Sequence, residues 1–153
     1  MSQPMNTRRI SAALLSVVLS CALVSQARAE SPKTEIKGAA ILNHACGKVA
    51  VKHMGLVHAG KIEEASKLGT QEMQDQWKAM PAKDREMMSG MMKEMSQPEA
   101  QFAAEIKAGG LLVIEGNKAT LTVKQEHKDA NGSVSGTLTQ SYVLDGATCL
   151  ITR

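Results

Sequence analysis

The residues best suited to chemistry in this sequence are methionines and histidines. Five of the chain's ten methionines lie between positions 87 and 95. Thioether sulfur and imidazole nitrogen are soft to intermediate metal ligands, so their clustering is typical of a Cu(I) site. Helical spacing favours convergence on one ion, because several of these methionines lie four residues apart on one helix face. The pairs are Met87 and Met91, Met88 and Met92, and Met91 and Met95.

The same methionines suit an apolar surface that holds no metal. The chain has only three aromatic residues, and Met is the flexible side chain that fills irregular cores and adaptable pockets. No two of the four histidines lie four residues apart, and the sequence has no Met-x-Met repeat. We therefore predict no metal site and no cofactor, and we keep a copper-binding protein using the Met cluster as the first alternative. The methionines predicted to line a core or a pocket are Met88, Met91, Met92 and Met95.

The sequence carries no recognisable catalytic motif. Gly-x-Ser-x-Gly, His-Glu-x-x-His and a phosphate-binding Gly-rich loop are all missing from it. A general base needs a partner that orients it, and His53 with Tyr142 or with a strand-borne Glu is one such pairing. We predict no catalytic residues, and a small isomerase- or hydrolase-like enzyme is the second alternative.

The first 29 residues have the three parts of a secretory signal. Arg8-Arg9 is the positive region, residues 10–24 are an apolar stretch, and Ala-Arg-Ala at residues 27–29 is a small-x-small cleavage site. The apolar stretch is shorter than the ~20 residues of a membrane-spanning helix. We therefore predict an exported, periplasmic protein whose mature chain has no membrane span. Lipid attachment at Cys21 and an uncleaved anchor are the alternatives to cleavage after Ala29.

Removal of this signal also removes the surplus of positive charge. The whole chain has 18 basic and 15 acidic residues, a formal net charge of +3. Arg8, Arg9 and Arg28 are basic and no acidic residue precedes Glu30, so 15 residues of each sign are left. Binding to phosphate needs a clustered cationic surplus. We therefore predict that nucleic acid is not a partner.

The two cysteines of the mature chain, Cys46 and Cys149, predict a disulfide. Disulfides form and persist in the oxidising compartment to which the signal directs the protein. Cys46 lies on the apolar stripe of a predicted helix and Cys149 on the last predicted strand, so packing of the helix over the sheet would bring them together. Two buried free thiols are the alternative.

Apolar periodicity predicts helices over the first part of the mature chain. The polar residues 30–38 predict a flexible lead. A long helix is then expected from about residue 38 to 59, with an apolar stripe of Leu42, Cys46, Val49, His53 and Leu56. Four shorter helices should follow: one over residues 62–68, one from an N-cap at Thr70, one from Pro81, and one from a capping box at residues 96–99.

The periodicity changes from helical to alternating after residue 110. Strands are predicted over residues 111–114, 119–124, 134–144 and 148–152, separated by three turn signals. These are Gly116-Asn117, Asn131-Gly132 and Asp145-Gly146. The predicted fold is α+β, with N-terminal helices packed on a curved four-stranded antiparallel meander in a single domain over residues 39–153.

Two segments resemble the nuclear transport factor 2-like superfamily, and within it small exported bacterial members. One is the long first helix running into LVHAGKIEEASKLGT at residues 56–70, and the other is the final hairpin SYVLDGATCLITR at residues 141–153. Family members often have Trp after that last turn, where this chain has Cys149. The resemblance covers residues 39–153 and implies a cone-like roll with a pocket between helices and sheet. It implies no particular activity, because this fold carries many functions.

We expect an exported binding protein without catalysis. Its concave surface between helices and sheet would hold a protein partner or a small apolar ligand, and an inhibitor or immunity-type protein is one version of the first case. A Met-rich helix can repack against another surface, and a dimer is compatible with this hypothesis. The expected ligand- or partner-binding residues are His53, Trp77, Met88, Met91, Met92, Met95 and Phe102.

Overall fold

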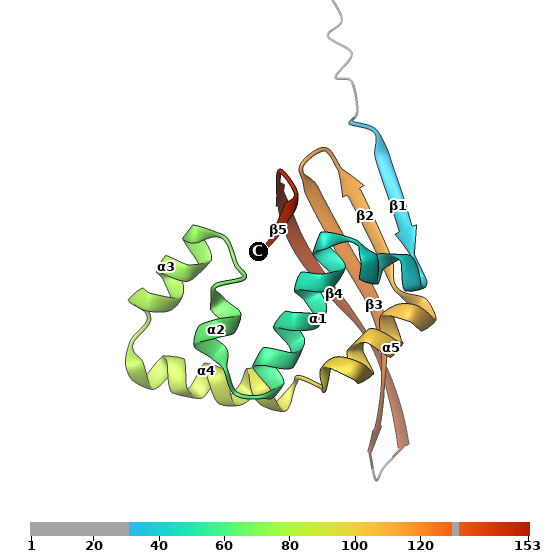
Figure 1. Cartoon of the computed structure of the whole chain (residues 1–153). Helices are drawn as coiled ribbons and strands as arrows, with labels where there is room; N and C mark the ends of the chain where they lie inside the picture. Colours follow the sequence, from blue (N-terminus) through green and yellow to red (C-terminus); the bar gives the residue numbers. More distant parts are fainter. Residues whose placement is uncertain (1–30, 130–131) are drawn as a thin grey trace, which may run out of the picture.

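Five antiparallel strands form one open sheet, and helices cover one of its faces (Figure 1). This computed structural model describes residues 31–129 and 132–153. The predicted export signal, with Cys21, lies outside the described residues, and so does Asn131 of the second turn signal. The α+β class predicted from the sequence is confirmed.

The sheet is a simple meander in which each strand pairs with the next along the chain. Two of the predicted turns are present, and Gly116 and Gly146 take positive φ angles of 62° and 59° there, which favours glycine. The strands are β1 (Lys33–Lys37), β2 (Leu111–Glu115), β3 (Lys118–Asp129), β4 (Gly132–Asp145) and β5 (Thr148–Thr152).

The prediction of a flexible lead over residues 30–38 is wrong for strand β1. Lys33–Lys37 pairs along its whole length with β2, with Ile36 opposite Leu112. Its sequence, Lys-Thr-Glu-Ile-Lys, is polar because one side of this edge strand has no partner strand, and charges on an edge prevent pairing with other chains. The sheet therefore has five strands rather than four.

The four shorter helices begin and end close to the predicted positions. Thr70 caps α3 as predicted, because its hydroxyl accepts a hydrogen bond from the Met73 amide. The predicted capping box before α5 is wrong, since Pro98 is the N-cap and Ser96 donates to the Lys93 carbonyl instead. The helices are η1 (Gly38–Asn43, a 3₁₀ helix), α1 (Ala45–His58), α2 (Ile62–Ser66), α3 (Gln71–Ala79), α4 (Ala82–Glu94) and α5 (Glu99–Gly109).

The single long helix predicted from residue 38 to 59 is divided at His44. This residue is extended and accepts a hydrogen bond from the Cys46 amide through Nδ1, so it acts as the N-cap of α1. The chain folds back tightly before this cap, and a side chain at Gly47 would overlap the Ile41 carbonyl. The buried residues of α1 are Cys46, Gly47, Ala50 and Val57, so Leu42, Val49, His53 and Leu56 are only partly covered.

The main core lies between the sheet and helices α1 and α5. Alternate residues of the strands face it, as expected for a half-buried sheet. The disulfide between Cys46 of α1 and Cys149 of β5 is present and fully buried, which confirms the predicted pair. Other buried members of this core are Ile41, Phe102, Ile106, Leu112, Leu121, Val123, Tyr142 and Ile151.

Helices α2, α3 and α4 form a separate group beside α1, beyond the β5 edge of the sheet (Figure 1). A second small core of Val57, Ile62 and Ala65 joins this group to α1, with Trp77 and Met92 packed against it. No residue of α4 is buried, so the methionines predicted to line a core or a pocket do not lie in a core. The short α2 and α3 leave most of α4 uncovered.

The connection between α2 and α3 is tied to the sheet by backbone hydrogen bonds. The Ile151 amide donates to the Leu68 carbonyl at 2.9 Å, and the Thr70 amide donates to the Ile151 carbonyl at the same distance. Gly69 thus forms a parallel bridge with Ile151 on the outer side of β5. Burial of Gly69 at this bridge fixes where α3 begins relative to the sheet.

Loss of the disulfide should strongly destabilise the fold. The Cys46–Cys149 bond closes a loop with a sequence separation of 103 residues. In the chain-entropy model a loop of this length contributes about 4–5 kcal/mol. We expect the double variant Cys46→Ala/Cys149→Ala to lose about this much unfolding free energy in urea. Reductant should lower the stability of wild type but not of the variant, and an equal effect on both would contradict the prediction.

The chain's one tyrosine offers a second test of the core. Burial raises the pKa of the Tyr142 phenol well above its usual value of 10. The folded state therefore keeps the proton that the unfolded chain releases, so this contribution is complete below about pH 10 and is lost as the pH rises further. Phenolate absorbance should appear only together with unfolding. Tyr142→Phe should lose less stability above pH 10 than wild type, and phenolate formation in the intact fold would refute this.

Candidate functional site

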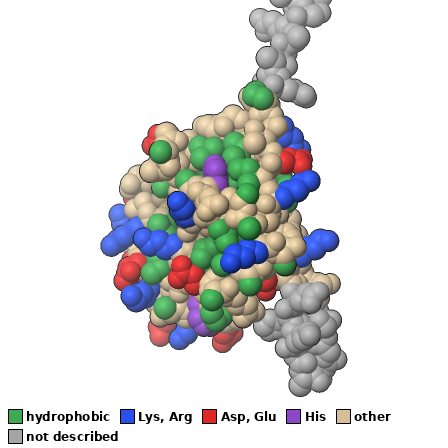
Figure 2. Space-filling view, turned by 45° about the vertical axis from the view of Figure 1, so that its right-hand side comes forward, with side chains coloured by type: hydrophobic (Ala, Val, Ile, Leu, Met, Phe, Trp, Pro, Cys, Tyr) green, Lys and Arg blue, Asp and Glu red, His purple; other side chains and the backbone are tan. Residues whose placement is uncertain are grey.

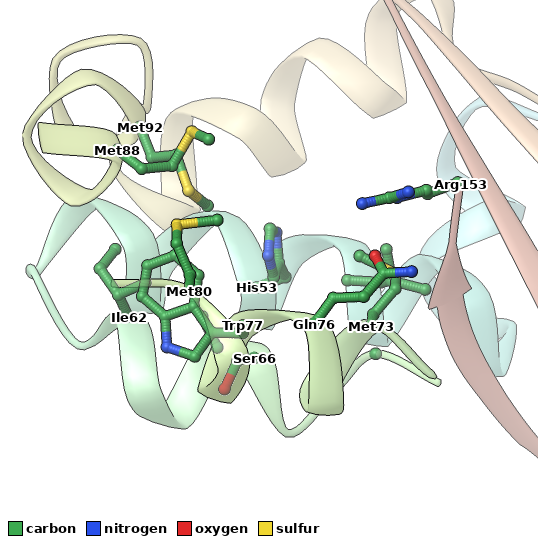
Figure 3. A pocket seen from close by; sticks show the side chains of 13 residues that line it. His53, Ile62, Ser66, Met73, Gln76, Trp77, Met80, Met88, Met92 and Arg153 are labelled. Atoms are coloured by element: carbon green, nitrogen blue, oxygen red, sulfur yellow. The ribbon is translucent and has the colours of Figure 1, made fainter. Parts of the chain in front are cut away.

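A pocket of about 230 Å³ lies between α1, the α2–α4 group and the end of β5 (Figure 3). Each of these elements contributes to its wall, which is mostly apolar. The lining residues are His53 from α1; Ile62, Ala65 and Ser66 from α2; Gly69; Met73, Gln76, Trp77 and Met80 from α3 and its C-cap; Met88 and Met92 from α4; and Ile151 and Arg153 from β5 and the residue after it.

The structure brings four of the seven predicted binding residues together in this pocket. His53, Trp77, Met88 and Met92 come from three helices and line one space. Met88 and Met92 lie one helical turn apart, so both face the same way from α4. This space lies between the helices and the end of β5.

The other three predicted residues lie elsewhere. Phe102 is 1% exposed and belongs to the main core beneath α5. Met91 and Met95 are 52% and 81% exposed, and with Met87 they form a stripe on the surface of α4. The pattern of methionines on α4 thus contains two faces, of which only Met88 and Met92 belong to the pocket.

Nine of the thirteen described lining residues were not predicted as part of a site, among them Met73, Met80 and Arg153. Met73 and Met80 lie four residues before and three residues after Trp77, so the stripe on α3 was a usable signal. Arg153 gave no signal, because its place at the pocket depends on how β5 meets the helices. Figure 3 shows the Arg153 side chain extending from the end of β5 toward the pocket.

Polar contacts between α2, α3 and α4 hold the wall of the pocket. The indole nitrogen of Trp77 donates to Oε1 of Glu63 at 3.1 Å, which fixes the ring. The same oxygen lies 3.6 Å from the Arg85 guanidinium, so one carboxylate links three helices. Both contacts are partly exposed to water, and their value is therefore mainly in orientation.

The pocket is weakly charged. Burial lowers the pKa of the His53 imidazole below its usual value of 6.5, so this side chain is neutral at pH 7. No Asp or Glu side chain is among the described residues that line the pocket, and Arg153 is the one permanently charged side chain among them. Tyr142 is buried in the main core and does not line the pocket, so the pocket does not contain the His53–Tyr142 pairing.

The surface near the helices has mixed charge. Figure 2 shows lysine and arginine side chains interspersed with aspartate and glutamate, and hydrophobic side chains in small separate groups between them. This face therefore has no continuous cationic area of the kind that binds phosphate. In residues 31–129 and 132–153, no helix is long and apolar enough to cross a membrane.

Comparison of the chain with protein-family models, with curated proteins and with solved structures found no match.

Burial of His53 predicts a loss of stability in acid. Because its pKa is lowered in the fold, the unfolded chain binds a proton more readily, and stability falls as the pH drops below about 6.5. The loss is at most about 1.4 kcal/mol for each pH unit. His53→Leu should remove this part of the pH dependence, measured by urea unfolding at pH 7.5 and pH 5.

A matched control is available on the same helix. His58 is exposed at the end of α1, so His58→Leu should keep the wild-type pH dependence. If both variants lose the same amount of stability in acid as wild type, His53 is not the group responsible.

Proposed function

We propose that this protein is an exported, non-catalytic binding protein that holds a small apolar ligand in the pocket beside His53 and Trp77. The observation that carries this proposal is the lining itself, in which methionine, isoleucine, alanine and tryptophan side chains surround a few polar groups. This composition is the usual one for small-molecule sites, whose few polar groups orient the ligand.

The volume of the pocket limits the size of the ligand, and its methionine side chains allow some variation in ligand shape. A volume of about 230 Å³ is below the ~300–1,000 Å³ of sites for drug-sized molecules, so the ligand is small. Four methionines in the wall can change rotamer at little cost and can fit more than one shape. Gln76 and Arg153 supply polar atoms at the β5 side (Figure 3), where a polar end of the ligand would lie.

The charge of the pocket supports binding without catalysis. A general base is most effective when a partner orients it, and the described lining has no Asp or Glu side chain beside His53. A neutral, half-buried imidazole is suited to accept or donate one hydrogen bond to a ligand.

The protein-partner form of this proposal has its own support. Met87, Met91 and Met95 lie at intervals of four residues and are 64%, 52% and 81% exposed. Exposed methionines in a row are typical of surfaces that repack against different partners. An inhibitor or immunity-type protein, and a dimer, would use this stripe.

Relationship to the nuclear transport factor 2-like superfamily is part of the proposal. The order of elements from η1 onward, with helices before an antiparallel meander, supports it. In that case the sheet would be the wall of a cone-like roll, and the pocket beside β5 would be its opening.

The proposal is tested by the fluorescence of Trp77, the chain's one tryptophan. A small apolar probe, 1-aminonaphthalene, should change this fluorescence in a saturable way. Met80→Glu places a charge in the pocket wall and should weaken probe binding by at least ~10-fold, because burying an unpaired charge is costly.

Two variants serve as controls. Met80→Leu keeps the wall apolar and should leave probe affinity unchanged, and Met95→Glu adds the same charge at an 81% exposed position outside the pocket. Absence of saturable binding to wild type would refute the proposal. Equal effects of Met80→Glu and Met95→Glu would show that the probe binds elsewhere.

A further inference from the structure

We infer that the same pocket contains a Cu(I) site formed by the sulfur atoms of Met80, Met88 and Met92 and the imidazole of His53. This site is a second binding activity, and it does not depend on whether an apolar ligand also binds there. It differs from the arrangement that the sequence favours for copper, which places the ion on α4 alone.

Three separate elements bring these ligands together. Met88 and Met92 lie on consecutive turns of α4. Met80 is the C-cap of α3, and His53 lies in α1. In Figure 3 the thioether sulfurs of Met80, Met88 and Met92 gather on one side of the pocket, and the His53 ring points into the space beside them. A site assembled from three elements can surround an ion from more directions than one helix face alone.

The donor set selects the metal. Thioethers bind soft ions, and imidazole binds Cu, Zn, Fe and Ni, so three sulfurs with one nitrogen favour Cu(I) among the biological metals. Hard cations such as Mg²⁺ and Ca²⁺ need carboxylate or carbonyl oxygens. The described lining has no Asp or Glu side chain, which disfavours them and leaves a monovalent ion as the best match for neutral ligands in a mostly apolar wall.

The other methionines of α4 provide a matched control within the chain. Met87, Met91 and Met95 have the same side chain on α4 or at its C-cap, but they do not line the pocket with His53, whereas Met88, at 40% exposure, does. Any affinity that comes from methionine composition alone would be shared by both groups. Affinity that comes from the pocket belongs to Met88 and Met92 with Met80.

The test is an anaerobic titration of the whole mature protein with Cu(I), in competition with the chromophoric chelator bicinchoninate. Wild type should bind one ion with a Kd below ~1 μM. The triple variant Met80→Leu/Met88→Leu/Met92→Leu should lose at least ~100-fold in affinity, since losing direct ligands costs more than the ~10–100-fold of outer contacts. Met87→Leu/Met91→Leu/Met95→Leu should bind as wild type does.

A second measurement identifies the ligands directly. Ag(I) is a redox-inert soft analogue of Cu(I), and its addition should shift the methyl NMR signals of Met80, Met88 and Met92. The signals of Met87, Met91 and Met95 should stay in place. Circular dichroism confirms that both triple variants are folded, and leucine is close in size to methionine, so the core should tolerate the exchange.

The outcomes separate this inference from the apolar-ligand proposal. Loss of Cu(I) binding in the pocket triple variant, which circular dichroism shows to be folded, supports the metal site, whereas a Kd weaker than ~1 μM for wild type overturns it. Equal losses in both triple variants, or NMR shifts confined to Met87, Met91 and Met95, also overturn it. Failure of the probe to bind while Cu(I) binds overturns only the apolar-ligand proposal.

Discussion

The pocket depends on the backbone pairing between Ile151 and the connection from α2 to α3. Two hydrogen bonds of 2.9 Å join Ile151 to Leu68 and Thr70, and Thr70 then caps α3. Without this bridge, α2 and α3 would contact the rest of the fold only through their own few apolar side chains. Cys149, two residues before Ile151 on the same strand, is joined by the disulfide to α1. One short strand, β5, therefore positions both α1 and the α2–α4 group.

The proposed binding properties follow from the part of α4 that α2 and α3 leave uncovered. Helices α2 and α3 are too short to bury α4, and the gap between them, α1 and β5 becomes a pocket walled by flexible thioethers. A thioether offers both an apolar contact and a soft electron pair, so one wall is suited to an apolar molecule and to Cu(I). Because the lining carries little charge, it favours an apolar molecule or Cu(I) over a ligand that carries several charges.

Local patterns allowed much of the fold to be predicted. The alternation of Ala119, Leu121 and Val123 with polar neighbours is typical of a half-buried strand, and Thr70 caps a helix through its hydroxyl, which accepts from the Met73 amide three residues on. Strand β1 could not be recognised, since an edge strand with one inward residue, Ile36, has no alternating run. The exposure of Met91 could not be predicted either. A helical stripe of apolar residues shows that one face is apolar, but it does not show whether another element covers that face.

The sequence by itself determined the order of helices and strands from α1 to β5, two of the turns and the disulfide. The elements and turns depend on neighbouring residues, and the mature chain has only Cys46 and Cys149 to pair. The tertiary structure alone decided which methionines share a space with His53 and Trp77. The lining residues are spread along the sequence from His53 to Arg153. The β5 contacts and the angles between the helices bring them together, and those angles cannot be predicted from the periodicity of apolar residues. Met88 and Met91 are equivalent as residues and are 40% and 52% exposed, and only the position of α4 makes one of them, Met88, part of the pocket wall.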